Sequence, residues 1–315
     1  KIDALTNLFE EFEFNSLLNE LKNSGNLFIP DREPHQKEIQ PRQVVHGFGS
    51  DTPIGPVEAD YKLITHVEQL HEWTEKLRDQ NLFALDTETT SLNYMSARLV
   101  GISFALSPGK AAYIPFGHDY IGAPEQLSMD VVLTSLKPVL EDPELKKVGQ
   151  NLKYDINVLA QHGVFLQGGL HDTMLQSYVI NSTATRHDLT SLAERYLELK
   201  TTSFEDIAGK GSSQLTFNEV PLDTAASYAA EDADVALRLH HMLSALLNEY
   251  PDKAELLERI ELPLISVLSK IERTGALVDP HLLQTQSMQL KLRLTELEEK
   301  AFILAGEPFN LASPK

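Results

Sequence analysis

Residues 83–88 read Phe-Ala-Leu-Asp-Thr-Glu, an apolar run that ends in two carboxylates two positions apart. Side chains two apart on a β-strand point to the same face of a sheet, so Asp86 and Glu88 can share one cation. Acidic residues also end many strands without any function, because they suit turns. The stretch therefore predicts a β-strand, and its two acids are a candidate metal site only if other parts of the chain support it.

Further extended segments surround this strand. Runs 99–106 and 110–116 follow it, which predicts a three-stranded meander, and a short strand near 61–64 precedes it. After Pro124 the apolar residues recur mostly at helical spacing. The predicted helices are 66–78, 128–140, 151–162, 172–180, 189–197 and 223–248, with a short extended piece at 147–149. This order predicts an α/β fold, a mixed sheet covered by helices.

The two ends of the chain differ from this middle part. Residues 1–22 have an amphipathic helical pattern, and residues 23–58 are rich in proline and glycine, which predicts a linker. A helix is expected at 252–273 and a short strand at 276–278, before Asp279 and Pro280 open a long helix. Leucines recur every seven residues along this helix, as in a coiled coil, at 283, 290, 297 and 304. So few heptads favour the other interpretation, one long helix packed along a domain edge.

The composition limits the class of protein. With 315 residues and 42% hydrophobic content, the chain can bury a sizeable core, and its length suggests roughly two domains. It has no apolar run long enough for a bilayer and no signal-peptide pattern, so we expect a cytoplasmic protein without membrane contact. The absence of cysteine excludes thiolate metal sites and favours hard cations. A net charge of −19 opposes non-specific adhesion to nucleic acid, so any DNA site must be local.

A second candidate motif is GQNLKYD at residues 149–155. A short strand here turns into a helix, and Asn151 and Asp155 lie one turn apart on one side of that helix. The simpler interpretation makes Asn151 an N-cap and Asp155 a first-turn acid favoured by the helix dipole. Taken alone, the motif favours this simpler interpretation.

A third candidate motif is YAAEDAD at residues 228–234. Tyr228 and Asp232 are four residues apart on a predicted helix, so a phenol and a carboxylate face the same way. Glu231 and Asp234 point elsewhere, and we interpret them as a solvated acidic face. The alanines between them would let another backbone or a substrate approach closely.

Acids on separate elements make sense together if they converge. Carboxylates packed in one place repel each other strongly unless divalent cations neutralise them. Two metal ions ~4 Å apart would serve phosphoryl transfer, because one activates a water molecule and the other stabilises the leaving oxygen. Tyr228 would orient that water. The three segments alone do not establish that they meet.

The order of these motifs resembles the exonuclease motifs of the DEDD superfamily, in the branch with a tyrosine four residues before the last aspartate. The stretches RHDLTSLAERYL (186–197), FEDIAGKGSSQLTF (204–217), IERTGALVDP (271–280) and AGEPFNLASPK (305–315) are similar to bacterial family A DNA polymerases of the polymerase I type. Ribonuclease D and related exonucleases share the motifs but not these stretches. The resemblance covers nearly the whole chain. It implies a ribonuclease H-like sheet flanked by helices, followed by the first helices of a polymerase thumb.

The resemblance also implies roles for the acids and the tyrosine. Asp86, Glu88 and Asp232 would bind the tighter of two divalent cations, and Asp86 with a water-mediated Asp155 would hold the second. The cations would be Mg²⁺, with Mn²⁺ or Zn²⁺ as alternatives. Tyr228 and Glu88 would position the attacking water.

Further residues match positions that contact the substrate in this family. Leu92 and Phe204 would lie against the terminal bases. The positions that face the 3′-terminal nucleotides are Gln150, Asn151, Tyr154 and Arg186. A plain core or loop role fits each of these residues as well. His118 and Asp119 could be taken as metal ligands, but a loop after a strand explains them better.

The same resemblance divides the chain into regions. Residues 1–22 correspond to the tail of a 5′ nuclease region, 23–58 to a linker, 59–250 to a 3′-5′ exonuclease domain and 251–315 to the start of a polymerase region. The chain would then be a fragment with neither polymerase nor 5′ nuclease activity, and the missing domains would be its partners. It would be a monomer that acts on single-stranded DNA 3′ ends as a proofreading exonuclease in a bacterial cytoplasm.

Two alternatives remain open. An RNA-trimming exonuclease of the ribonuclease D type would use the same motifs, and matched RNA and DNA oligonucleotides would separate the two. A catalytically silent spacer domain is the other alternative. The presence of all four acids and the tyrosine speaks against it.

Overall fold

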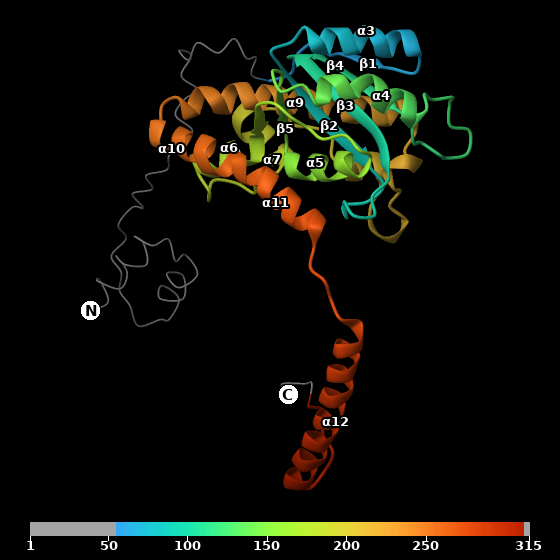
Figure 1. Ribbon diagram of the computed structural model, residues 1–315, viewed down its shortest axis with the longest axis vertical. Coiled ribbons are helices and arrows are strands. Elements are labelled where there is room, and N and C mark those ends of the chain that lie inside the picture. Colours follow the sequence, from blue (N-terminus) through green and yellow to red (C-terminus); the bar gives the residue numbers. More distant parts are fainter. Residues whose placement is uncertain (1–54, 312–315) are drawn as a thin grey trace, which may run out of the picture. The chain divides into compact units, whose positions relative to one another are not determined.

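The fold is built around one six-stranded β-sheet (Figure 1). The computed structural model describes residues 55–311, so the predicted helix at 1–22 and most of the predicted linker at 23–58 lie outside the described residues. In chain order the strands are β1 (Asp60–Leu63), β2 (Leu82–Thr89), β3 (Leu99–Ser107), β4 (Lys110–Pro115), β5 (Lys146–Gly149) and β6 (Leu170–Asp172).

The strands lie in the order β1-β4-β3-β2-β5-β6 across the sheet. β2, β3 and β4 pair antiparallel as consecutive neighbours, which confirms the predicted meander. β1 joins β4, β5 joins β2 and β6 joins β5 in parallel, so the sheet is mixed, as predicted. β2, β5 and β6 therefore run in one direction, and their carboxyl ends lie along the same edge of the sheet.

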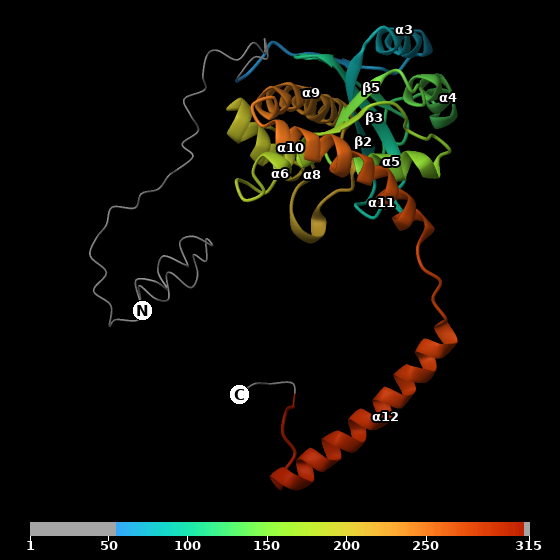
Figure 2. The ribbon, with the colours of Figure 1, turned by 60° about the vertical axis from the view of Figure 1, so that its left-hand side comes forward.

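Helices cover both faces of this sheet (Figures 1 and 2). The 26-residue helix α9 contacts β1 to β5 on one face, whereas α3, α4 and α5 share a core with apolar side chains of the other face. In chain order the helices are α3 (Val67–Arg78), α4 (Met129–Leu140), α5 (Leu152–Gln161), α6 (Thr173–Ile180), α7 (Leu189–Leu192), α8 (Phe204–Ala208), α9 (Leu222–Leu247), α10 (Pro251–Leu256), α11 (Leu262–Thr274) and α12 (Pro280–Ala305).

Alternating side chains along β2 explain the two layers. Phe83 and Leu85 are fully buried in the core shared with α3 and α4, whereas Ala84 packs on the opposite face against α9. Near this point α9 presents Ala230 and Ala233 to the sheet. Because small residues face each other here, the helix backbone can lie close to the sheet. The residues that follow Ala84 on the same face of β2 are thereby brought close to α9.

Some predicted elements differ from the structure. The strand predicted at 276–278 is wrong, since residues 275–279 have no regular structure. The helix predicted at 252–273 consists of α10, a π-helical segment Leu257–Glu261 and α11, and the helix predicted at 189–197 is α7 continued by a π-helical segment Ala193–Leu197. The sequence analysis missed β6 and α8, because three and five residues are too few to show a periodicity.

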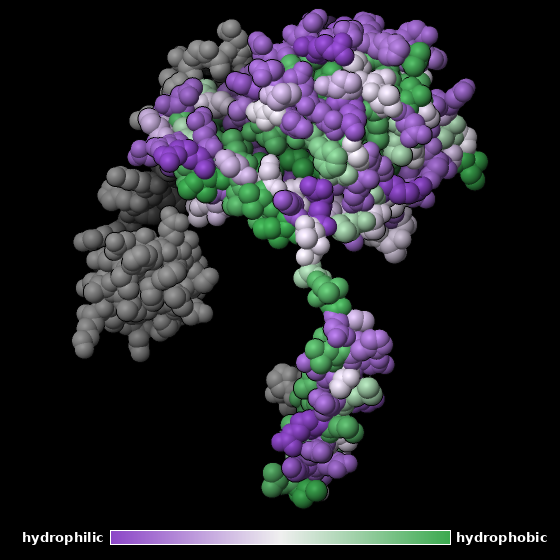
Figure 3. Space-filling model, viewed as in Figure 1, coloured by the Kyte–Doolittle hydropathy of each residue, from purple (hydrophilic) through white to green (hydrophobic). Residues whose placement is uncertain are grey.

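The long helix α12 begins as predicted. The Asp279 carboxylate accepts the N–H groups of His281 and Leu282, both at 3.0 Å. No side chain of α12 is buried, and apolar side chains are visible along it in Figure 3. The predicted packing of this helix along a domain edge is therefore not found within residues 55–311. In the same part of the chain, no helix has both the length and the apolar character that a membrane span requires.

Candidate active site

Three of the predicted site carboxylates meet at the carboxyl end of β2. Asp86 and Glu88 share the face of the strand on which Ala84 packs against α9, and Asp232 comes from α9 itself. One oxygen from each of the three carboxylates lies within 4.8 Å of the others. The structure thus brings together side chains from positions almost 150 residues apart. An irregularity in the β2–β3 pairing between Glu88 and Thr89 lies directly beside them.

This concentration of acids disfavours their charged forms. Burial, and then the charge of Asp232, raises the pKa of Asp86, and burial raises the pKa of Asp232 to about 8. The pKa of Glu88 is also raised, by burial and then by the charges of Asp86 and Asp232. Without a cation, the site therefore retains protons at neutral pH that ordinary carboxylates would have released.

The donor set fits a hard divalent cation. Oε1 of Glu88 is buried and has no hydrogen-bond partner among the described residues, which is costly for an oxygen of this kind. The two neighbouring groups, Asp86 and Asp232, also offer only carboxylate oxygens. Oxygen ligands of this kind are preferred by Mg²⁺ and Mn²⁺. A cation bound here would give the Glu88 oxygen a partner and neutralise the repulsion between the acids.

Asp155 approaches the same strand end from the other side. The N–H and the hydroxyl group of Thr87 both donate to Oδ1 of Asp155, at 3.0 Å and 2.5 Å. Burial and the charge of Asp86 raise the pKa of Asp155, although these hydrogen bonds oppose the rise. Asp155 is therefore electrostatically coupled to the cluster, but it is not one of the three closely spaced carboxylates. Its water-mediated contact with a second cation stays a prediction.

Tyr228 lies one helical turn before Asp232 and forms a hydrogen bond with its carboxylate. The ring is partly buried, with centroid distances of 6.4 Å to Phe204 and 6.0 Å to Phe217. Burial, followed by the charges of Asp232 and Glu88, raises the pKa of the Tyr228 hydroxyl above its ordinary value. Tyr228 therefore remains a protonated phenol and can donate a hydrogen bond.

Three predicted substrate contacts lie near the start of α5, with Gln150 and Asn151 in the turn after β5 and Tyr154 on the helix itself. The Tyr154 hydroxyl donates to the carbonyl oxygen of Ser91 at 2.5 Å, which places it beside the loop after β2. The amide group of Gln150 donates to the carbonyl of His187 at 2.8 Å and is tied down by that bond. Asn151 has left-handed backbone angles, φ 56° and ψ 46°, and its side chain makes no capping bond. Asn151 therefore occupies the N-cap position as predicted, but its side chain does not cap the helix.

The other predicted substrate contacts lie on different segments. Leu92 is 94% exposed in the loop after β2. Phe204 begins α8 and stacks on Phe217 at a centroid distance of 6.3 Å. Arg186 is exposed and pairs with Asp188 at 3.4 Å. Their roles in binding stay predictions.

One acid of the third motif was misinterpreted. Asp234 is fully buried, and its carboxylate accepts the N–H of Gly109 at 2.7 Å and the hydroxyl of Tyr61 at 3.0 Å. Arg238 lies 4.0 Å away. Asp234 is therefore part of a buried network that joins α9 to β1 and the β3–β4 turn, and the prediction of a solvated residue is wrong. Glu231 does remain partly exposed, and it accepts the N–H of Thr202.

Some residues that hold the site in place were not predicted. Thr87 was assigned no role, yet it anchors Asp155. The alternation of a strand could have indicated this, because Thr87 must point away from Asp86 and Glu88. His118 and Asp119 do lie in the loop after β4, as expected, and the ring of His118 bonds to the Tyr113 hydroxyl at 2.9 Å.

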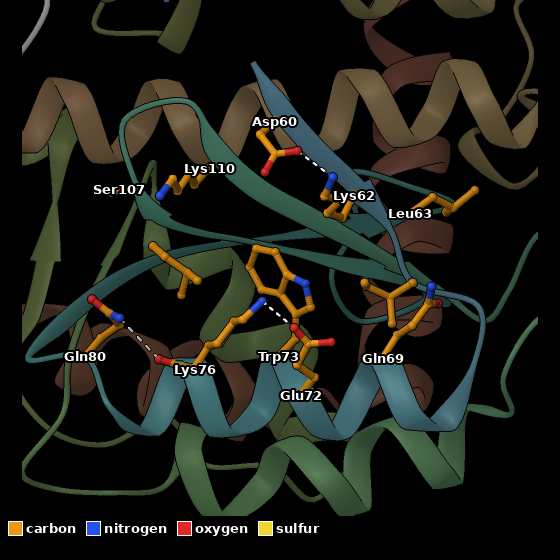
Figure 4. Close-up of a pocket in the computed structure, with 12 residues that line it drawn as sticks. Asp60, Lys62, Leu63, Gln69, Glu72, Trp73, Lys76, Gln80, Ser107 and Lys110 are labelled. Atoms are coloured by element: carbon orange, nitrogen blue, oxygen red, sulfur yellow. Dashed lines mark hydrogen bonds and ion pairs between the residues drawn. The ribbon is translucent and has the colours of Figure 1, made fainter. Parts of the chain in front are cut away.

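A separate groove of about 520 Å³ lies between β1 and α3 (Figure 4). Trp73 lies at its centre, but none of the predicted site residues lines it. Two lysines beside it, Lys62 and Lys76, pair with Asp60 and Glu72 at 2.5 Å and 2.7 Å. The groove therefore lies apart from the converging carboxylates, and the candidate active site is the one at the end of β2.

Comparisons with known proteins indicate the family of the chain. A protein-family model described as a 3′-5′ exonuclease matches residues 61–248. DNA polymerase I of Pseudomonas aeruginosa is 47% identical over 315 residues, which cover 99% of this chain and 33% of the relative. DNA polymerase I of Rhizobium leguminosarum is 39% identical over 272 residues, covering 81% of this chain and 27% of the relative. The chain thus spans about a third or less of the length of these relatives.

Solved structures share the fold. The POL domain of Pol1 from M. smegmatis, in complex with a DNA primer-template and dNTP, has a TM-score of 0.64 at 21% identity, covering 81% of this chain and 39% of that one. The catalytic core of RRP6 from Trypanosoma brucei has a TM-score of 0.54 at 16% identity, covering 70% of this chain and 55% of that one. These likenesses confirm the ribonuclease H-like architecture. The family model over residues 61–248 shows that the chain belongs to the 3′-5′ exonuclease family, and the similar proteins named above are DNA polymerases I.

Proposed function

We propose that this chain is the proofreading part of a DNA polymerase I, which hydrolyses the 3′-terminal phosphodiester of single-stranded or frayed DNA and releases nucleoside 5′-monophosphates. The observation that supports this most directly is the meeting of Asp86, Glu88 and Asp232, with a Glu88 oxygen that has no partner among the described residues. The relatives named DNA polymerase I support DNA as the substrate. All the acids needed are present, which argues against a silent spacer domain.

The proposed cofactors are two divalent cations, Mg²⁺ first and Mn²⁺ or Zn²⁺ as alternatives. Asp86, Glu88 and Asp232 would hold one of them, and Asp86 with Asp155 would hold the other, Asp155 through water. When bound, such cations neutralise phosphate charge and make water a better nucleophile. The partly buried position of the acids strengthens these interactions, because less water screens them.

The chain's own residues would orient the reacting groups. Hydrolysis forms a bond between a water oxygen and phosphorus and breaks the bond to the 3′ oxygen of the preceding nucleotide. The Tyr228 hydroxyl, kept protonated, donates to Asp232, and its oxygen can still accept a hydrogen bond from the attacking water. Glu88 would hold the same water from the other side. Orientation of this kind is one of the larger contributions that a protein makes to phosphoryl transfer.

The substrate would be held by apolar and polar contacts around this strand end. Leu92, which is exposed, and Phe204 would lie against the last bases. Arg186 is an exposed cation in an acidic chain and is suited to a backbone phosphate. The groups expected near the 3′-terminal nucleotide are Gln150, Asn151 and Tyr154.

The proposed setting is a longer protein. Residues 59–250 would form the exonuclease domain and residues 251–315 the start of a polymerase region, with a 5′ nuclease region before residue 23. The partners would be those further domains, and the molecule would act as a monomer in a bacterial cytoplasm. The organisms of the relatives and the short share of their length that this chain covers support this proposal.

The test compares initial cleavage rates on single-stranded, terminally mismatched and fully paired DNA, and on single-stranded RNA, all with one 3′ sequence at fixed Mg²⁺. Terminal bases must leave the duplex before they reach the metals, and stacking on a side chain returns only ~1–3 kcal/mol per base. We expect single-stranded DNA to be cut fastest and paired ends slowest. Faster cleavage of RNA would favour a ribonuclease, and no cleavage of any substrate would favour the spacer.

A further inference from the structure

Asp172, at the end of β6, is a buried carboxylate that the proposed chemistry does not use. It is 1% exposed, and its two oxygens accept four backbone N–H groups. Oδ1 accepts from Asn151 at 3.2 Å, Met174 at 2.9 Å and Leu175 at 3.3 Å, and Oδ2 accepts from Leu152 at 2.8 Å. Asn151 and Leu152 lie at the start of α5, and Met174 and Leu175 lie in the first turn of α6. One side chain therefore caps two helices.

The pairing of two strands explains how this is achieved. β5 and β6 are parallel neighbours, and Gly149 lies opposite Asp172 in the register. Each strand leads into a helix within a few residues, so the amino ends of α5 and α6 lie side by side. The first N–H groups of a helix have no partner within it, and the positive end of the helix dipole attracts an acid. A carboxylate at Asp172 satisfies both sets of N–H groups.

The amino end of α5 depends on this arrangement. Asn151, in the capping position, has left-handed backbone angles and gives no side-chain capping bond. The accepting oxygens that the side chain of a capping residue would normally supply come instead from Asp172, about twenty residues after Asn151 in the chain. Thr173 reinforces the link, because its hydroxyl donates to Oε1 of Gln150 at 2.5 Å and to the Gly149 carbonyl at 3.3 Å.

The position of α5 in turn sets the position of Asp155. This residue is in the first turn of α5, and its Oδ1 must meet the N–H and hydroxyl groups of Thr87 on β2. A shift or rotation of the amino end of α5 would break these bonds and move the carboxylate away from Asp86. β6, β5 and β2 are thus connected through side chains as well as through the sheet.

We propose that Asp172 is a positioning residue for the exonuclease site: by capping α5 and α6 with one carboxylate, it holds Asp155 and the turn at Gln150 and Asn151 in their working positions. The proposal rests on the proposed function for its effect on catalysis. The capping of α5 and α6 by Asp172 can be tested without any measurement of exonuclease activity.

Two substitutions separate the double cap from an ordinary one. Asp172→Ser places a good N-cap on α6, but its short side chain cannot also reach Asn151 and Leu152. Asp172→Asn keeps the shape but only one accepting oxygen, because its amide nitrogen is a donor and cannot accept the N–H group that the second oxygen held. The matched control is Asp279→Asn, the same change at a carboxylate that caps only α12.

The first measurement is backbone hydrogen exchange in the metal-free protein without substrate. In both Asp172→Ser and Asp172→Asn we expect the first turn of α5 to lose protection while the first turn of α6 keeps it, because each variant retains one accepting oxygen for α6. The control should alter neither. Unchanged protection of α5 in Asp172→Ser would overturn the proposal, because α5 would then not depend on Asp172.

The second measurement is steady-state cleavage of a single-stranded oligonucleotide, at a temperature where circular dichroism shows every variant fully folded. A displacement of a catalytic group by about an ångström can lower the rate roughly 100-fold, so we expect kcat of Asp172→Ser to fall between about 10-fold and 100-fold. KM should change little, and Asp279→Asn should keep wild-type values. A folded Asp172→Ser variant with wild-type kcat would overturn the positioning role. If the wild-type protein cleaves nothing, the proposed function fails, while the hydrogen-exchange result still decides the double cap.

Discussion

Replacing Asp232 by asparagine should stabilise the metal-free protein by an amount that grows with pH. Burial raises the pKa of Asp232 from 3.8 to about 8, so over this range the folded protein holds a proton that the unfolded chain has released. The bound proton contributes its full stabilisation of the fold below the pKa that Asp232 has in the unfolded chain. This contribution is lost as the pH rises through the pKa that Asp232 has in the folded protein. Asparagine carries no charge at any of these pH values, so the variant does not lose this stability.

The magnitude follows from the size of the shift. One pKa unit corresponds to about 1.4 kcal/mol, so the rise from 3.8 to about 8 sets an upper limit of roughly 6 kcal/mol at alkaline pH. Asp232 is partly exposed and shares its charge repulsion with Asp86 and Glu88, so water and local relaxation reduce this figure. We expect a stabilisation of about 2 kcal/mol near pH 9 and roughly none near pH 4.

The assay is urea unfolding followed by circular dichroism, with a chelator present, at several pH values between about 4 and 9. The matched control is Glu249→Gln, which removes one exposed charge just after the same helix and should show no such trend. A difference between Asp232→Asn and wild type that does not change with pH, or a variant less stable than wild type at alkaline pH, would refute the reasoning. The same variant should have no measurable exonuclease activity.

Three further variants and one titration test other parts of the site. Tyr228→Phe should lower kcat by roughly 10-fold to 100-fold while cation binding measured by calorimetry persists, because it loses one oriented hydrogen bond; a wild-type kcat would make Tyr228 a packing residue. Binding of Mn²⁺ near pH 7 should release protons, since the raised pKa values leave protons on the acids, and calorimetry in two buffers of different ionisation enthalpy would show no difference if this is wrong. Leu92→Ala should raise KM for single-stranded DNA several-fold and leave the thermal midpoint unchanged, since this side chain is 94% exposed; an unchanged KM would remove it from the substrate site. Asp234→Asn should cost about 1–3 kcal/mol in urea unfolding because it weakens a buried network, and a neutral result would contradict that network.

Periodicity along the chain was enough to predict most of the fold. The apolar run within 82–88 and the two runs after it are strong signals, because each strand is at least six residues long and has one or both faces buried. β6 gave no such signal, since three residues cannot show a period. Its partner and register depend on the packing of residues far away in the chain. The role of Asp172 was invisible for the same reason.

Asp234 shows a second limit of sequence analysis. The third motif lies on α9, and Asp232 and Asp234 are two positions apart, on different sides of that helix. An amphipathic helix has one buried side, so an acid away from that side should be solvated. α9 is instead covered on more than one side, because the sheet packs on Ala233, the region of α7 packs on Val235, and β1 and the β3–β4 turn enclose Asp234. No pattern within the helix reveals such a second covering layer.

The end of β2 shows why the motif has the form acid-threonine-acid rather than two acids with any spacer. Alternation sends Asp86 and Glu88 to the α9 face, where Asp232 meets them, and it sends Thr87 to the other face, where Asp155 accepts both of its donors. Three consecutive residues therefore join two helices on opposite sides of one sheet. Valine has nearly the shape of threonine but lacks the hydroxyl, so it would keep the strand and the N–H bond while removing the 2.5 Å contact to Asp155. The middle residue, which carries no charge and would bind no metal, thus ties the fourth carboxylate directly to the strand that carries two of the other three.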